Sequence, residues 1–355
     1  MKTLLKIFLF LSVLFSITLC TNSSNSDENQ EQIIDDDSAS QDGENQNPVS
    51  DDFSYVILKR GSSDGNALLY EIGNNSGKVK DAGNIVGVGF NIIFNAVTSS
   101  SSKVFIYEQN FDPFEGYIHS FDKTTGEVIK TTLEIDKEAF GNSPGLVSMD
   151  WDSNRGVLIA IINSEIEFPS GFSKVVEINP VSFEITDLDI NLGEFFTTIS
   201  TTIKNSKLYV SVVEEFENSR FKDFVEIDIL NKAFTSLDLE NREGALIQLA
   251  STNSDNLFFG YSLVFGTQRG NATEPFSLNI ENSNYENLLP NIETSNFNNG
   301  VKSYFANNQN IIASLTGADG KDLLLQYSIE FNNTDLIELS DFGIAQGGAI
   351  IDIRN

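Results

Sequence analysis

The sequence predicts an all-β protein that is built by repeating one four-stranded unit. The first observation is that short apolar runs rich in Ile, Val, Phe and Tyr alternate with clusters of Asn, Ser, Gly and Asp. This is the pattern of many short antiparallel strands joined by turns. The second observation is that no segment has the apolar spacing of a long amphipathic helix. The third is that one hairpin pattern recurs along the chain, which indicates a repeat architecture.

The recurring pattern is an apolar residue, a polar turn and a second apolar residue seven positions after the first. The six copies are Ile72/Val79, Phe121/Val128, Ile178/Ile185, Ile227/Phe234, Leu278/Tyr285 and Ile329/Leu336. Their first members are separated by 49, 57, 49, 51 and 51 residues, which is a near-constant step. Gly77 and Gly126 suit the positive φ of a tight turn, because glycine has no Cβ. The copies therefore predict six β-hairpins.

Two further apolar runs precede each hairpin, so the sequence predicts four strands for every repeat. The first repeat lacks its opening run, whereas the chain ends with an unmatched run at 348–353. We expect this C-terminal strand to complete the first unit, because closing the ring removes open sheet edges. The prediction is a β-propeller of six four-stranded blades. Seven blades is the main alternative, and a pair of β-sandwiches is the third.

The clearest hairpin copy reads Asp-Lys-Thr-Thr-Gly-Glu-Val at positions 122–128. It resembles the repeats of quinoprotein-like and YVTN-type β-propellers, and one or two copies match closely. The resemblance implies a propeller fold for the whole repeated region.

The first 19 residues predict an export signal. Lys2 and Lys6 lie beside an uncharged apolar run at 7–19, which at 13 residues is shorter than the ~20 residues of a membrane span. The run ends at Cys20, the only cysteine. Ile-Thr-Leu-Cys at 17–20 resembles the lipobox of bacterial lipoproteins, although Leu19 replaces the small residue usual there. We expect a signal peptide over 1–19 and lipid attachment at Cys20, with ordinary cleavage and secretion as the alternative.

Residues 20–52 predict a disordered acidic tether, which separates Cys20 from a β-propeller over 53–355. Positions 21–52 hold ten acidic residues and no Lys or Arg, a composition that cannot support a core. The repeated region keeps 41 of the 51 acidic residues and 20 of the 22 basic ones. A net charge of −29 argues against nucleic-acid binding, which needs a basic surface. One Cys and one His argue against an internal disulfide and a zinc site.

The candidate binding site lies on the loops that join second to third strands. We predict that these loops are long and share one face with the connections between blades, and function commonly resides on such loops. Three of them interleave carboxylates with Phe, a combination that suits a cation, a basic partner or a sugar. The candidate residues are Glu108, Phe111, Asp112, Phe114, Glu115, Glu165, Glu167, Phe168, Glu214, Glu215 and Glu217. The alternative is that the rings pack between blades and the acids are solvated.

Two other features favour structural roles. The stretch 150–156 partly matches a calcium loop, but Arg155 and Ile161 occupy positions where an EF-hand needs Gly and Glu. We therefore expect a strand-to-turn junction there, with Trp151 packed between blades. His119 falls on a predicted third strand without a nearby Ser or Cys nucleophile, and a packed or solvated histidine is expected. Asp150 and Asp352 are the carboxylates that could face a central channel.

We expect a non-enzymatic binding or scaffold module for a protein or a glycan, because no catalytic motif is found. The alternative function is a calcium-dependent hydrolase or lactonase, with Ca²⁺ held in the channel. We expect a monomer that is exported and lipid-anchored to a bacterial membrane, at the outer membrane or the cell surface.

Overall fold

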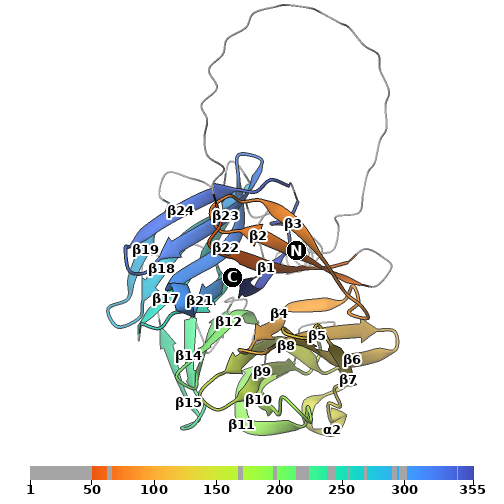
Figure 1. Ribbon diagram of the computed structural model, residues 1–355. Helices are drawn as coiled ribbons and strands as arrows, with labels where there is room; N and C mark the ends of the chain where they lie inside the picture. The colour runs from red at the N-terminus through yellow and green to blue at the C-terminus, as the bar shows by residue number, and fades with distance from the viewer. Residues whose placement is uncertain are drawn as a thin grey trace, which may run out of the picture. The chain divides into compact units, whose positions relative to one another are not determined.

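Six antiparallel sheets account for nearly all regular structure in the computed structural model (Figure 1). The structure describes residues 50–61, 66–166, 171–194, 198–212, 224–237, 245–254, 256–267, 270–289, 294–295, 302–341 and 343–355. Within these ranges α2 (Lys137–Phe140) is the only α-helix, and no helix there is long and apolar enough to cross a membrane.

Each sheet is a blade of four strands in chain order, and the first blade takes its innermost strand from the C-terminus. Blade 1 contains β25 (Ala349–Arg354), β1 (Ser54–Lys59), β2 (Ala67–Gly73) and β3 (Val79–Ile85). Blade 2 contains β4 (Ile92–Ser99), β5 (Lys103–Phe111), β6 (Phe114–Asp122) and β7 (Val128–Thr132). Blade 3 contains β8 (Gly145–Asp152), β9 (Val157–Asn163), β10 (Phe172–Ile178) and β11 (Ile185–Glu194).

The remaining three blades follow the same order from the innermost strand outward. Blade 4 contains β12 (Thr198–Lys204), β13 (Lys207–Val212), β14 (Phe224–Asp228) and β15 (Ala233–Leu237). Blade 5 contains β16 (Ala245–Ser251), β17 (Leu257–Thr267), β18 (Gly270–Asn279) and β19 (Asn284–Asn287), with β20 (Thr294–Ser295) also paired to β18. Blade 6 contains β21 (Tyr304–Ala306), β22 (Ile311–Ala318), β23 (Lys321–Ser328) and β24 (Asn333–Glu338), and the 3₁₀ turn η2 (Asn307–Gln309) joins its first two strands.

The innermost strands close a ring. Each innermost strand contacts the innermost strand of the next blade, in the order β25, β4, β8, β12, β16 and β21, and β21 contacts β25 again. The outer strands β11, β15, β19 and β24 lie along the rim (Figure 1). The chain forms a six-bladed β-propeller. The predicted closure is confirmed, because β25 pairs antiparallel with β1 from Ser54↔Arg354 to Leu58↔Ala349. The alternatives of seven blades and of two sandwiches are wrong.

The hydrophobic core consists of six clusters, and each cluster lies between two neighbouring blades. Because the inner strands of a blade are covered on both faces, they carry nearly continuous apolar sequence, such as the fully buried run from Leu158 to Ile162. Trp151 of β8 stacks on Phe105 of blade 2 at 5.9 Å between ring centroids. The prediction that Trp151 packs between blades is therefore confirmed.

The alternation of strands gives the ring two different faces. The connection face carries the loops between blades and the second-to-third-strand loops, and the turn face carries the other two turns of each blade. Five predicted hairpin pairs occur in register, including Ile72↔Val79 and Phe121↔Val128. The sixth prediction is wrong by two residues, since Tyr327 pairs with Thr334. Ile329 lies in the turn beyond β23, and the buried residue that packs against blade 5 is Tyr327.

Loop lengths on the connection face differ from the prediction. Only two residues join β5 to β6, two join β17 to β18, and two join β22 to β23. The second-to-third-strand loops are therefore not uniformly long, because several of these strand pairs extend to a tight hairpin at the face itself. The turn at Asn205-Ser206 is short as predicted, and both residues have positive φ.

Candidate functional site

The predicted stretch 108–115 forms the end of the β5–β6 hairpin on the connection face of blade 2. The ladder runs without a break from Lys103↔Asp122 to Phe111↔Phe114, so Asp112 and Pro113 alone make the turn. Proline favours a turn and cannot donate to a ladder, which accounts for the reversal at this point. The candidate residues are therefore held on two rigid strands.

Glu108 points into the blade, where it pairs with His119. The two lie on the same face of the hairpin, and His119 Nε2 is 2.8 Å from Glu108 Oε2. Both side chains are buried, at 0% exposure for His119 and 6% for Glu108, and Lys130 Nζ is 3.8 Å from the same oxygen. Burial raises the pKa of the Glu108 carboxyl, but the hydrogen bond and charge of His119, then Lys130 and the Gly89 backbone, bring that pKa below its ordinary value.

Gly89 is required by this buried carboxylate. A Cβ at position 89 would lie 1.8 Å from Glu108 Oε1. The backbone N–H of Gly89 lowers the pKa of the Glu108 carboxyl by donating a hydrogen bond to it. Glu108 is thus enclosed by protein groups, on the face of β5 that carries Ile106 and packs against blade 1.

The end of this hairpin exposes aromatic and acidic side chains together. Phe111 is 44% exposed, and its ring packs edge-on against Phe114 at 6.1 Å between centroids. Asp112 and Glu115 are exposed beside them. Phe90, 46% exposed, lies on the adjacent connection between β3 and β4, where Asn91 accepts a backbone hydrogen bond from Gln109. We call Phe90, Phe111, Asp112, Phe114 and Glu115 the blade 2 tip.

Glu165 lies close to this hairpin. Ile166, the next residue, and Gln109 of β5 both approach Gly145, where a Cβ would meet them at 2.7 and 2.9 Å. The structure therefore places the start of the third-blade loop near β5 of blade 2. The other candidates lie outside the described residues: Cys20, Glu167, Phe168, Glu214, Glu215 and Glu217.

An ion pair crosses the centre of the ring. Lys302, which precedes β21 of blade 6, places its Nζ 2.7 Å from Asp150 Oδ1 on β8 of blade 3, the opposite blade. The same ammonium donates to the carbonyls of Val97, at 3.2 Å, and Met149, at 3.4 Å. Thr201 of blade 4 donates to the other Asp150 oxygen. One cation thus joins inner strands of blades 2, 3 and 6, with side-chain exposures of 15% for Lys302 and 6% for Asp150.

The second carboxylate considered for a channel site, Asp352, is also paired with a lysine. Its Oδ1 accepts a hydrogen bond of 2.8 Å from Lys123 of the blade 2 hairpin turn. Within the ranges that the structure describes, no three His, Cys, Asp or Glu side chains are grouped as a metal ion would require. Asp150 and Asp352 therefore each have a lysine of this chain as their partner.

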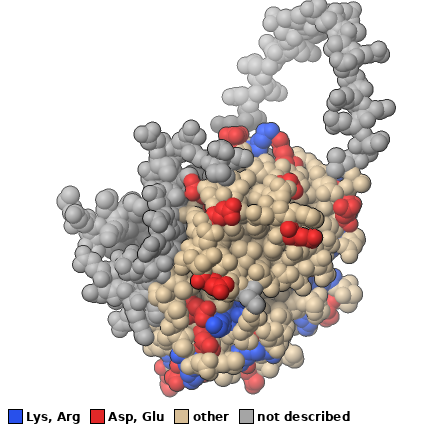
Figure 2. Space-filling model, turned by 90° about the vertical axis from the view of Figure 1, so that its left-hand side faces the viewer, with Lys and Arg blue, Asp and Glu red and all other residues tan. Residues whose placement is uncertain are grey.

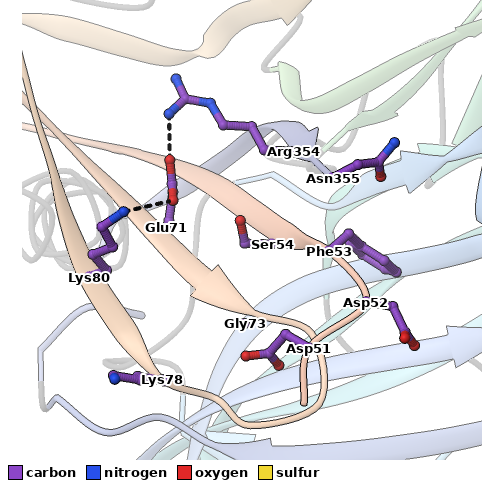
Figure 3. A pocket seen from close by; sticks show the side chains of 10 residues that line it. All are labelled: Asp51, Asp52, Phe53, Ser54, Glu71, Gly73, Lys78, Lys80, Arg354 and Asn355. Carbon is purple, nitrogen blue, oxygen red and sulfur yellow. Dashed lines mark hydrogen bonds and ion pairs between the residues drawn. The ribbon is translucent and has the colours of Figure 1, made fainter.

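A cavity of about 510 Å³ lies on the turn face of blade 1, where the described chain begins and ends. Figure 3 shows Arg354 and Lys80 directed at Glu71, and Asp51 beside Gly73. Lys80 is 3.8 Å from Glu71, and Arg354 donates to the same carboxylate. Through Glu71 on β2, these contacts link Arg354 of β25, on the far side of β1, with Lys80 of β3.

Asp51 replaces a turn side chain that blade 1 lacks. In blade 2 the Asp122 carboxylate accepts the backbone N–H groups two and three residues later, at 2.9 and 2.8 Å. Gly73 occupies the equivalent position in blade 1, and there Asp51 Oδ1 accepts the N–H groups of Asn75 and Ser76, both at 2.8 Å. A Cβ at Gly73 would lie 2.1 Å from Asp51 Oδ2. The carboxylate of Asp51 therefore fills the space of the missing side chain.

Moving the aspartate from position 51 to position 73 tests whether Asp51 does the work of the missing turn side chain. We expect Asp51→Ala to lower the free energy of unfolding by about 1 kcal/mol, because the turn loses its hydrogen bonds. Gly73→Asp alone should also destabilise, since its Cβ collides with Asp51, whereas Gly73→Asp in the Asp51→Ala background should restore stability. Urea unfolding of the four proteins measures this reversal of sign. Equal effects of Gly73→Asp in both backgrounds would contradict the assignment.

The acid excess of the sequence is visible on the surface as separate side chains. Figure 2 shows Asp and Glu scattered over one side of the molecule, with most of its Lys and Arg beside acids toward one end. On this side of the molecule the acidic side chains are therefore not gathered into a single patch.

Comparison with known proteins identifies the fold alone. No protein-family model and no curated protein matches the sequence. Among solved structures, TolB from Acinetobacter baumannii aligns with a TM-score of 0.53 and 10% identity over 85% of this chain and 65% of TolB. An oligogalacturonate lyase in complex with manganese aligns with a TM-score of 0.47 and 9% identity over 79% of this chain and 77% of the lyase. This chain thus spans less than two thirds of TolB, and the similarity supports the propeller architecture.

Several residues of these sites were not found from the sequence. Lys302 has no local pattern that distinguishes it, because its partner stands 152 positions earlier on the opposite blade. The Glu108–His119 pair did have a signal, since Asp112-Pro113 between two apolar runs indicates a tight turn that aligns the two strands. Asp51 falls within the predicted tether, and nothing in the sequence marks it as a turn residue.

Proposed function

We propose that this protein is an exported propeller, lipid-anchored through Cys20, that serves as a non-enzymatic binding module for a protein or glycan. The observation that carries this proposal is the blade 2 tip, where Phe90 and Phe111 are about half exposed and the carboxylates of Asp112 and Glu115 are exposed. Single exposed apolar residues are ordinary, whereas grouped ones mark interaction sites. The tip stands on a rigid hairpin and lies on the face that carries the interblade loops.

The state of the channel supports binding over calcium-dependent catalysis. A calcium site needs several oxygen ligands that are free to converge on the ion. Asp150 is engaged by Lys302 and Thr201, and Asp352 is engaged by Lys123. Calcium would have to displace these ammonium groups, so the tip is the better candidate for the functional surface.

Substituting the proposed lipidation site tests the anchor. We expect Cys20→Ala to move the protein from the membrane fraction to the soluble fraction, because the lipid supplies the attachment. Thr21→Ala is the matched control and should remain with the membrane. Fractionation followed by immunoblotting measures both. A wild-type protein that is already soluble would support the secreted alternative and contradict the anchor.

A further inference from the structure

We propose that the blade 2 tip recognises lysine or arginine side chains in a basic segment of a partner protein. This inference rests on the proposed binding function and names the chemistry of the partner. Three observations support it: the exposed rings lie close to blade 2, their side chains are ordered by neighbouring groups, and the same blade binds its own Lys130 between a ring and a carboxylate.

The grouping is specific to this part of the surface. Seven large apolar residues are well exposed among the described residues, and four of them, Val86, Phe90, Phe111 and Ile129, lie on blade 2 or on the connection that leads into it. The other three are Val181, Leu230 and Phe331. Val181, Leu230 and Phe331 each stand alone in a different hairpin turn on the turn face. The end of the β5–β6 hairpin is therefore the one place among the described residues where a well-exposed ring, that of Phe111, packs on a second ring, that of Phe114.

The rings of the tip are held in place by contacts with other side chains. The Arg60 guanidinium stacks on Phe90 at 5.7 Å and on Phe94 at 5.2 Å, and it donates to the Ile92 carbonyl at 3.0 Å. Phe111 and Phe114 face each other across the last pair of the β5–β6 ladder. Because these side chains are already ordered, binding would cost little conformational entropy.

A lysine of the same blade shows which ligand an aromatic ring and a carboxylate can bind together. Lys130 Nζ lies 3.8 Å from the centre of the Tyr117 ring and 3.8 Å from Glu108 Oε2, so an ammonium is held between a ring and a carboxylate. Asp112 follows Phe111 in the turn, so the Phe111 and Phe114 rings again occur with an exposed carboxylate, whereas Glu115 accepts a hydrogen bond from Tyr117. Among the described residues, no Lys or Arg lies over either of these two rings.

Charge complementarity selects a basic partner over a neutral one. The chain carries a net charge of −29, and the two carboxylates of the tip are exposed. Aromatic faces attract cations through their quadrupole, and an adjacent carboxylate adds a charged hydrogen bond. A partner lysine or arginine would satisfy both, and the field of the protein would speed its approach.

Peptides of defined charge test the proposal on the full mature chain. We expect a twelve-residue peptide of alternating Lys and Ser to bind, with an affinity that falls on raising NaCl from 50 to 300 mM, and a Glu/Ser peptide not to bind. Phe111→Ala with Phe114→Ala should weaken binding about fivefold or more, as should Asp112→Asn with Glu115→Gln. Phe331→Ala and Asp335→Asn, an exposed ring and an exposed acid on blade 6, are the matched controls and should change the affinity less than twofold.

Two outcomes would overturn the proposal. Equal binding of the basic peptide by the Phe111/Phe114 variant and wild type would show that general charge, and not the tip, attracts it. Binding of cellohexaose that depends on the same rings and not on salt would assign the tip to a glycan. The second outcome leaves the proposed binding function standing, whereas the absence of any envelope ligand that depends on Phe111 would contradict that function itself.

Discussion

Replacing Lys302 with methionine should lower the free energy of unfolding by about 3–5 kcal/mol, the range found when one partner of a buried ion pair is removed. Methionine keeps most of the side-chain volume, so the loss reports the charge. Asp150 would then be buried with Thr201 as its remaining hydrogen-bond donor. The carbonyls of Val97 and Met149 would also lose the hydrogen bond that Lys302 donates to each. Urea unfolding and the melting temperature measure the change.

The exposed pair Lys321–Glu338 provides the control for this experiment. Its side chains are 55% and 57% exposed, so Lys321→Met should cost at most about 1 kcal/mol. Adding Asp150→Asn to Lys302→Met should recover part of the loss, because no uncompensated charge then stays buried. If Lys302→Met is no more destabilising than Lys321→Met, the central ion pair does not hold the ring together.

Replacing Glu108 with glutamine should lower stability by about 2 kcal/mol at neutral pH. The carboxylate accepts from His119 and lies near Lys130, and hydrogen bonds to charged groups contribute about 1.5–3 kcal/mol each. Glutamine keeps the size of the side chain and removes the charge. Glu338→Gln on the surface is the matched control and should change stability by less than about 1 kcal/mol.

The pH dependence of stability gives a second test of Glu108. Its pKa is lower in the folded protein than the ordinary 4.5, so the folded state favours the ionised carboxylate. This contribution is complete above pH 4.5 and is lost as the pH falls through the folded-state pKa. Glu108→Gln should therefore lose less stability than wild type on acidification from pH 6 to pH 3. Parallel acid profiles of the two proteins would contradict the assignment.

The sequence predicted the architecture because the architecture is repetitive. Each blade reuses one hairpin whose apolar residues and turn residues recur at a fixed distance, so errors in single copies did not affect the count. The misplaced sixth hairpin shows this, since Ile329 lies in a turn but the strands around it were still found. The orphan run at the C-terminus predicted the closure for the same reason, because an unpaired strand edge is unfavourable.

The candidate site was predicted in part. An acid-rich, Phe-rich stretch identified the end of the β5–β6 hairpin, but composition could not separate the buried Glu108 from the exposed Asp112 and Glu115. That separation depends on which face of the strand each residue occupies and on the position of Gly89, which lies in another element.

The sequence by itself determined that this chain repeats a four-stranded β unit six times and closes the ring with its C-terminal strand. Local periodicity encodes those features, so they can be read along the chain. Only the tertiary structure decided that Lys302 reaches Asp150 across the axis, that Asp51 fills the turn of Gly73, and that the connection carrying Phe90 is bonded to β5 through Asn91 and Gln109. Each of these contacts joins separate elements of the fold, and such contacts are fixed by how the blades pack around the ring.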